Sequence, residues 1–425
     1  MDFVDRFPLY PLLISFVIYP VFAALVLKLP RSIRMQAFAV LNVIGLALMC
    51  LLSGAKDVRI KVALLYSKTA VFFFALYFVL VLLHYVALRL SRRDNTIWPS
   101  VAFLSPIVLL AYVKFFADVA NPFGSLLAPV GLKTFGLFFV GLSYMSFRLV
   151  HLVQEVRNDL VEMPTIWEYL SFAFFVPTLS IGPINPYSVF IRSMRAPDRQ
   201  KTPLVRSWLR ILIGLTKYIF LGSLVAQFTY LGLLRDGHPH AMIDLFVAIP
   251  AYTLYLYCNF SGFCDMVIGV SGLLNIQVAE NFDRPFMSRN FQELWSRWHI
   301  TLSTWIRDLA FTPLTKWMMR RFGVKYANHI VAAALMISFL GVGIWHGKGL
   351  NFLIFGALQG LGLVTVHYYT VWLKKRLGRE KFSKYRKNKA IAAIATVMTF
   401  AYFSATLFFF ANTFQDMHVI LTSLK

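Results

Sequence analysis

Residues 331–346 read VAAALMISFLGVGIWH, an almost purely apolar run that ends in a histidine. An α-helix needs about 20 consecutive apolar residues to cross the hydrocarbon core of a bilayer. Comparable apolar runs cover most of the chain, at 8–28, 36–53, 69–90, 97–118, 134–155, 165–185, 209–233, 242–258, 260–275, 328–346, 350–373 and 390–412. We therefore expect an all-α, polytopic membrane protein with about ten to twelve transmembrane helices.

The composition agrees with a membrane environment. The 425-residue chain is 58% hydrophobic and has a mean hydropathy of +0.65. A water-soluble chain of this size would need more polar surface to cover its core. Because apolar runs leave no room for a soluble domain, we expect one membrane-embedded domain over residues 1–425. The first span lacks the basic start of a signal peptide, so we expect it to be retained.

The charge is strongly positive, with 42 Lys and Arg against 19 Asp and Glu and a formal net charge of +23. The basic residues concentrate between apolar runs, most densely at 374–389. Basic loops of membrane proteins stay in the cytoplasm and contact anionic lipid headgroups. We therefore expect this segment to be cytoplasmic and the acidic first five residues to be outside. We expect the positive charge to contact lipid headgroups of the bilayer, and we expect no nucleic-acid partner.

Residues 291–309 have a different pattern, because their apolar positions recur at spacings of three and four. This spacing predicts one amphipathic helix with three tryptophans on one side, lying in the interface or re-entering the membrane. His299 falls at the edge of the apolar stripe, where its side chain could face a cavity. The alternative is a solvated connector in which His299 only bonds to a neighbour.

His346 is the sharper signal, because ionisable side chains at membrane depth are rare and generally functional. Burial favours the uncharged imidazole, which can accept a proton from an attacking hydroxyl. A structural histidine that caps a neighbouring carbonyl is the alternative. The glycines that flank this position permit close helix approach or an exposed backbone; they are Gly341, Gly343, Gly347 and Gly349.

Other polar groups lie within or beside apolar runs. We expect them to form a buried hydrogen-bond network, in which Asp265 must find a partner and Asn259 is an alternative substrate contact. The members of this predicted network are Asn259, Ser261, Asp265, Asn281, Asp283 and Arg284.

Several chemistries lack their sequence signatures. There is no Gly-x-Ser-x-Gly and no phosphate-binding Gly-x-x-x-x-Gly-Lys, which leaves a histidine-centred reaction in which the acceptor's own hydroxyl is the nucleophile. The three cysteines are scattered, and His238 and His240 lie in a polar loop, so we expect no metal site.

Two blocks around the histidines carry a family resemblance. Residues 297–303 read RWHITLS, followed by Trp305, Arg307 and Asp308, and residues 345–347 read WHG. These blocks resemble the signature of the membrane-bound O-acyltransferases, the MBOAT family. Further blocks are similar to the branch that transfers D-alanyl groups in teichoic acid modification, so that the resemblance covers about residues 140–365; they are 143–148 (SYMSFR), 175–178 (FVPT), 182–184 (GPI) and 281–286 (NFDRPF).

The resemblance implies a ring of transmembrane helices, with re-entrant helices around a central tunnel, in a bacterial plasma membrane. It implies that His346 is the catalytic histidine and His299 the second family histidine. It also implies no permanently bound cofactor, but an acyl donor held as a thioester on the phosphopantetheine arm of a small cytoplasmic carrier protein. The acceptor would be a cell-envelope polymer or an acyl-relay protein outside.

The basic segment 311–326 would suit an acidic carrier protein, because opposite charges orient an encounter. Ordinary flanking charge that sets topology is the alternative for this segment.

Two other functions stay open at this point. The first is an O-acetyltransferase acting on an exported polysaccharide. The second is a transporter or flippase with histidines in its path, although the internal repeat typical of transporters is not seen.

Overall fold

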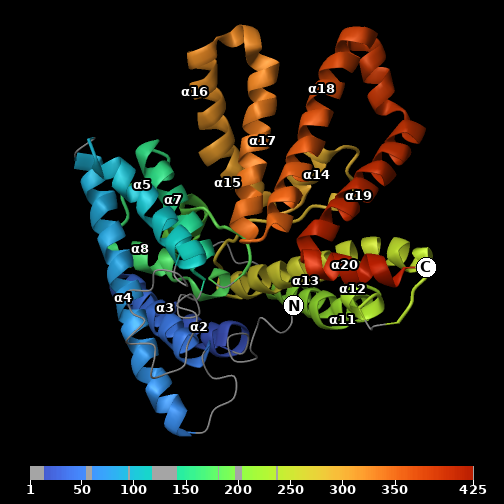
Figure 1. Ribbon diagram of the computed structural model, residues 1–425. Helices are drawn as coiled ribbons and strands as arrows, with labels where there is room; N and C mark the ends of the chain where they lie inside the picture. The colour runs from blue at the N-terminus through green and yellow to red at the C-terminus, as the bar shows by residue number, and fades with distance from the viewer. Residues whose placement is uncertain are drawn as a thin grey trace. The chain divides into compact units, whose positions relative to one another are not determined.

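The computed structural model describes residues 14–53, 60–93, 96–116, 141–179, 181–196, 203–235 and 238–424. Within these residues most of the chain is helical, and its β-structure is limited to two isolated bridges. The helices form two compact units, one of residues 1–214 and 263–279 and the other of residues 215–262 and 280–425. The predicted all-α architecture is therefore confirmed (Figure 1).

The first unit contains most of the N-terminal half. Its helices are α2 (Tyr19–Val26), α3 (Arg31–Ser53), α4 (Ile60–Arg93), α5 (Trp98–Ala111), α7 (Leu142–Arg157), α8 (Ile166–Ala173), α9 (Tyr187–Arg195) and nearly all of α10 (Leu204–Leu215). Helix α5 packs against α4 and α7, and α3 packs against α8. The Tyr169 hydroxyl of α8 donates to the Val81 carbonyl of α4 at 3.0 Å, which ties two elements distant in sequence.

A buried arginine organises the centre of this unit. Arg148 of α7 is 1% exposed and donates to the carbonyls of Phe172 and Ala173 and to the Thr178 hydroxyl, at 2.8–3.2 Å. A buried charge is tolerated only where such partners replace water. Two of the blocks that carried the family resemblance, 143–148 and 175–178, are therefore bonded to each other.

The second unit contains α11 (Gly222–Ala226), α12 (Tyr230–Leu233), α14 (Phe291–Arg297), α15 (Ile300–Ile306), α16 (Thr312–Phe322), α17 (Ala327–His346), α18 (Leu350–Lys387), α19 (Lys389–Ala411) and α20 (Phe414–Ser423). Figure 1 shows α16 with α17 and α18 with α19 as two helical hairpins whose turns lie on the same side of this unit. Helix α17 packs along α18, and His329 bonds to the Tyr368 hydroxyl between them at 2.7 Å. Helix α13 (Met242–Leu273) begins in this unit and ends in the first.

The described residues contain eight helical segments long and apolar enough to cross a membrane, which confirms a polytopic protein. The expected ten to twelve spans exceed this number for two reasons. Runs 242–258 and 260–275 form a single helix, α13. Runs 8–28, 134–155 and 165–185 yield only shorter helices where they are described; parts of the first two and Ser180 of the third lie outside the described residues.

The run 165–185 breaks for local reasons. Thr165 and Glu168 form a reciprocal capping box that starts α8 sharply. Pro177 lies in the following 3-10 turn and cannot donate a helical hydrogen bond, so the helix stops at Ala173. Gly182 has a φ of 129°, a conformation suited to glycine. The predicted span is therefore wrong.

Candidate active site

His346 lies at the last position of α17, where the apolar run ends. Its ring is half-buried and contacts two aromatic rings of neighbouring helices, with centroid distances of 5.8 Å to Phe355 of α18 and 4.9 Å to Phe410 of α19. The adjacent Gly347 has no room for a side chain, because a Cβ there would lie 2.2 Å from the Phe352 ring. Packing against α18 and α19 therefore sets the position of this imidazole.

A glycine contact brings α17 and α18 together just before His346. A Cβ on Gly343 would lie 2.3 Å from the Phe352 carbonyl oxygen and 3.0 Å from the Gly356 Cα. A Cβ on Gly356 would lie 2.5 Å from the Phe339 carbonyl oxygen. The expected close approach is confirmed for Gly343, whereas Gly341 has nothing within 4 Å of its Cβ position.

His299 lies in a quite different setting, at a break between two short helices. It has φ 46° and ψ 52°, the left-handed conformation, and forms the N-cap of α15 directly after α14 and Trp298. A non-glycine residue in this conformation costs about 1–2 kcal/mol, which the surrounding structure must offset. The predicted continuous helix over 291–309 is therefore wrong.

The segment around Asn281 supplies that support. The Ile300 N–H donates to the Asn281 carbonyl and the Asp283 N–H to the Arg297 carbonyl, both at 3.0 Å. These bonds hold 281–283 antiparallel to 297–300. The Asn281 side-chain oxygen bonds to the Thr301 hydroxyl at 2.8 Å and lies 3.2 Å from Nδ1 of His299.

The environment of His299 keeps its ring uncharged. The side chain is 5% exposed, and the Phe260 ring packs edge-on against it with a centroid distance of 4.7 Å. Burial lowers the pKa of His299 to about 3. At neutral pH the imidazole is therefore the neutral form, able to accept a hydrogen bond or a proton at one of its nitrogens.

A buried polar chain joins α14, the helix before His299, to α18 and α19, the helices whose rings contact His346. Trp295 Nε1 of α14 donates to Gln359 of α18 at 3.1 Å, and Gln359 donates to the Thr406 hydroxyl of α19 at 2.7 Å. Trp295 also packs against Phe339 of α17 at 4.7 Å. Gln359 was not predicted from the sequence, where its signal was an amide within the apolar run 350–373.

The predicted polar network divides into separate parts. Asp265 finds its partner in Arg210, whose Nε lies 2.8 Å away, and both belong to the first unit. Asn259 is 1% exposed and donates to the Tyr255 carbonyl at 3.0 Å. Asp283 and Arg284 are exposed, so their assignment to a buried network is wrong.

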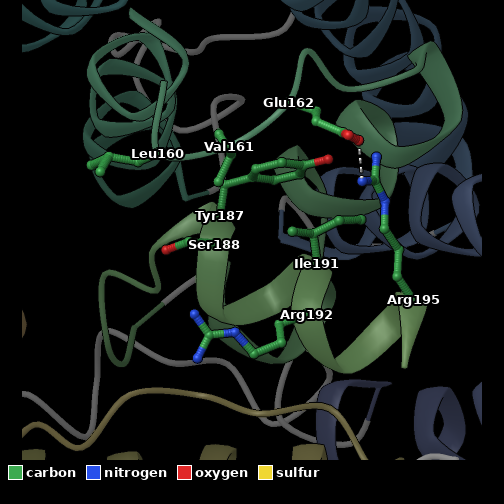
Figure 2. Close-up of a pocket in the computed structure, with 8 residues that line it drawn as sticks. All are labelled: Leu160, Val161, Glu162, Tyr187, Ser188, Ile191, Arg192 and Arg195. Carbon is green, nitrogen blue, oxygen red and sulfur yellow. Dashed lines mark hydrogen bonds and ion pairs between the residues drawn. The ribbon is translucent and has the colours of Figure 1, made fainter. Parts of the chain in front are cut away.

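The first unit has a surface pocket of about 240 Å³ of its own, lined by Leu160, Val161, Glu162, Tyr187, Ser188, Ile191, Arg192 and Arg195 (Figure 2). Arg195 forms ion pairs with Glu162 and Glu168, both at 2.7 Å. Burial alone would raise the pKa of Glu168, but Arg195 and Thr165 hold it below its usual value. This pocket has ion pairs but no histidine, so the chemistry is assigned to the second unit.

Within the described residues, no three His, Cys, Asp or Glu side chains gather closely enough to hold a metal ion. The candidate reactive groups of the second unit are instead the imidazoles of His346 and His299, the second of them beside the Asn281 amide. A neutral imidazole can remove a proton from a hydroxyl, and a second one can hold a reactant by a hydrogen bond. Such a pair suits the attack of a hydroxyl on an activated acyl group.

The chain belongs to the membrane-bound O-acyltransferase family, whose model matches residues 68–412. It is thus a multi-pass membrane acyltransferase, and the transporter alternative falls away.

Its relatives include the teichoic acid D-alanyltransferase of Bacillus subtilis, 25% identical over 82% of this chain and 86% of the relative, and that of Streptococcus thermophilus, 30% identical over 66% and 70%. The peptidoglycan O-acetyltransferase of Helicobacter pylori is 26% identical over 67% of this chain and 58% of the relative.

Proposed function

We propose that the chain transfers a D-alanyl group from a thioester donor to a hydroxyl of a cell-envelope polymer, with His346 as the general base. The observation that carries the proposal is a half-buried imidazole at the end of an apolar helix, in a member of an acyltransferase family. The Bacillus subtilis D-alanyltransferase matches over a larger share of both chains than the peptidoglycan O-acetyltransferase does, which favours D-alanyl over acetyl as the transferred group.

The reaction needs one proton acceptor and no covalent enzyme intermediate. His346 takes the proton of the acceptor hydroxyl as the hydroxyl oxygen attacks the thioester carbonyl carbon. The carbon–sulfur bond then breaks, and the departing thiolate takes the proton back from the imidazolium. His299 assists by a hydrogen bond that positions a reactant. Holding both reactants in contact supplies a large part of the rate advantage.

A site within the membrane solves a transport problem. The donor is made in the cytoplasm and the acceptor lies outside, with about 30 Å of hydrocarbon between them. A charged aminoacyl group does not cross lipid unaided. A passage that admits a thioester arm from one side and a hydroxyl from the other avoids moving either reactant completely across. We propose that such a passage, a tunnel open on both sides, runs through this protein.

The donor would be carried on the phosphopantetheine arm of a small acidic carrier protein, and the turn between α16 and α17 suits its docking. Large apolar side chains are exposed there beside basic ones; they are Trp317, Phe322, Val324 and Tyr326, with Lys316, Arg320, Arg321 and Lys325. Apolar contact gives affinity and opposite charge guides the encounter.

The test of the base is His346→Ala in the full-length protein reconstituted in vesicles. Loss of a general base typically reduces the rate by about 10²–10⁴-fold. The matched control is His418→Ala, at an exposed position of α20, which should transfer at the normal rate. Normal transfer by folded His346→Ala protein would contradict the proposal.

The donor is tested by offering the same vesicles two labelled substrates. One is a carrier protein whose phosphopantetheine arm bears labelled D-alanine, and the other is labelled acetyl-CoA. We expect label in the acceptor fraction only with the D-alanyl carrier. Transfer from acetyl-CoA alone would instead support the O-acetyltransferase alternative, which the peptidoglycan O-acetyltransferase relative favours.

Carrier docking is tested by reversing two charges in α16, Arg320→Glu with Arg321→Glu. We expect the KM for the carrier to rise while kcat stays unchanged, and the effect to weaken at high salt. Lys387→Glu, at the last position of α18, is the control for a change in overall charge. Equal KM changes in both variants would contradict a docking site on α16.

A further inference from the structure

Three hydrogen-bond donors converge on one atom next to His299. The side-chain oxygen of Asn281 lies 3.2 Å from the Thr301 backbone nitrogen, 2.8 Å from the Thr301 hydroxyl and 3.2 Å from Nδ1 of His299. A backbone N–H can only donate, so the atom facing Thr301 must be the amide oxygen and not the amide nitrogen. The orientation of the Asn281 side chain is therefore set by the backbone of α15.

This orientation decides which nitrogen of His299 carries the proton. Because the amide oxygen can only accept, Nδ1 must donate to it and is therefore the N–H nitrogen of the neutral ring. We infer that Asn281 is a positioning residue that holds His299 in the Nδ1–H tautomer, so that Nε2 acts in the reaction as a hydrogen-bond acceptor. The inference rests on the proposed function, since it assigns a role to the second histidine.

The ring has little freedom to adopt another arrangement. The left-handed backbone at His299, the bond from Ile300 to Asn281 and the edge-on Phe260 ring all constrain it. Asn281 is 1% exposed, so water does not compete for its oxygen. Nδ1 faces the Asn281 oxygen, so Nε2 is the nitrogen whose lone pair is left for a reactant.

Charged groups do not disturb this arrangement. In the segments on either side of His299, Arg297 pairs with Glu293 at 2.9 Å and with Asp283 at 4.0 Å, and Arg307 pairs with Asp308 at 2.8 Å. Burial, and no charged neighbour, lowers the pKa of His299. A neutral acceptor at Nε2 fits an O–H or N–H donor, such as the acceptor hydroxyl or an amide of the donor's arm.

The first test uses the intact protein. Histidine labelled with ¹⁵N, in protein held in nanodiscs and compared with a His299→Gln sample to assign the signal, reports which ring nitrogen is protonated. We expect a protonated Nδ1 and an unprotonated Nε2 at neutral pH. The opposite tautomer would overturn the inference, whatever happens to the variants.

The second test is Asn281→Asp. A carboxylate beside Nδ1 favours the imidazolium, in which Nε2 also carries a proton and can no longer accept. We expect kcat to fall about tenfold or more at pH 6 and to recover toward pH 9, with KM little changed. The unaltered protein should show no such loss from His299 over this range.

Asn185→Asp is the matched control. Asn185 is also 1% exposed, accepts from the Ala279 N–H at 3.0 Å and donates to the Gln277 carbonyl at 3.2 Å, but it lies in the first unit and bonds to no histidine. We expect it to lower stability without changing the pH profile. A pH profile of Asn281→Asp that matches this control would overturn the inference.

The inference and the proposed donor can fail separately. The tautomer measurement needs no substrate, and the pH profiles can be recorded with whichever acyl donor the unaltered protein uses. Transfer from acetyl-CoA alone would replace the D-alanyl proposal and leave the role of Asn281 intact.

Discussion

The two candidate site histidines, His346 and His299, are held by different kinds of interaction. His346 is positioned by packing, at a helix end where Gly343 and Gly356 let α17 and α18 touch and where aromatic rings contact the imidazole. His299 is positioned by hydrogen bonds, in a strained backbone conformation supported by Asn281. Shape therefore controls the first imidazole and donor–acceptor geometry the second.

This difference predicts different weaknesses. Packed helices tolerate loss of a polar group but not added volume, because interiors are close to crystal density. A hydrogen-bonded ring tolerates small shifts but not a change of protonation, because each nitrogen has a fixed role. Substitutions that add volume, add a proton or remove a connecting amide should therefore act on the two sites unequally.

The largest effect is expected from added volume at the glycine contact. Gly343→Leu would place a side chain where the Phe352 carbonyl oxygen lies 2.3 Å from the Cβ position. Neither backbone can move aside cheaply, so we expect a loss of at least about 3 kcal/mol in stability and of nearly all acyl transfer. Thermal unfolding in detergent and transfer by any folded fraction measure the two effects.

Gly341→Leu is the control for this substitution. It lies on the same helix two residues earlier, and its Cβ position has nothing within 4 Å. We expect stability and activity close to those of the unaltered protein, with a small gain from removing glycine within a helix. Equal damage at both positions would show that helix contact does not position His346.

The second prediction concerns protonation of His299. Its pKa is about 3 in the folded protein and near 6.5 in the unfolded chain, so the unfolded state binds the proton first as pH falls. Stability from this residue is therefore constant above about pH 6.5 and is lost between that pH and about pH 3. At pH 5 the expected loss is about 2 kcal/mol.

The measurement compares unfolding at pH 7 and pH 5 for the unaltered protein and His299→Gln. The variant should lose about 2 kcal/mol less on acidification, because it has no ring to protonate. His418→Gln, at an exposed position, should behave like the unaltered protein. Identical pH dependence in all three proteins would mean that His299 is not buried as described.

The sequence predicted the surroundings of His346 better than those of His299. An apolar run ending in Trp345 and His346 needs only its own residues to form a helix, and the close approach at Gly343 follows from the absence of a side chain. The break at His299 depends on bonds to Asn281, 18 residues away. Apolar spacing over 291–309 carries no information about such a partner, so it predicted one helix.

A similar limit explains the fused span. Asn259 separates the apolar runs 242–258 and 260–275 and suggested two spans. It does not break the helix, because its side chain donates to the helix's own backbone, the Tyr255 carbonyl, at 3.0 Å. Hydropathy detects loss of apolar character, whereas a helix ends only where its backbone bonds end.

The smallest effect is expected at Gln359 of α18, which bonds to Trp295 of α14 and to Thr406 of α19. Gln359→Leu removes the acceptor of Trp295 Nε1 and the donor to Thr406 while keeping a similar volume. Leaving a buried indole N–H without a partner should cost about 1–3 kcal/mol and loosen α14 from α18. Because the amide touches neither imidazole, kcat should fall only a few-fold. Double-mutant cycles with Trp295→Phe measure the coupling. An additive cycle would mean that the Gln359 amide does not hold α14, and that packing alone joins α14 to α18.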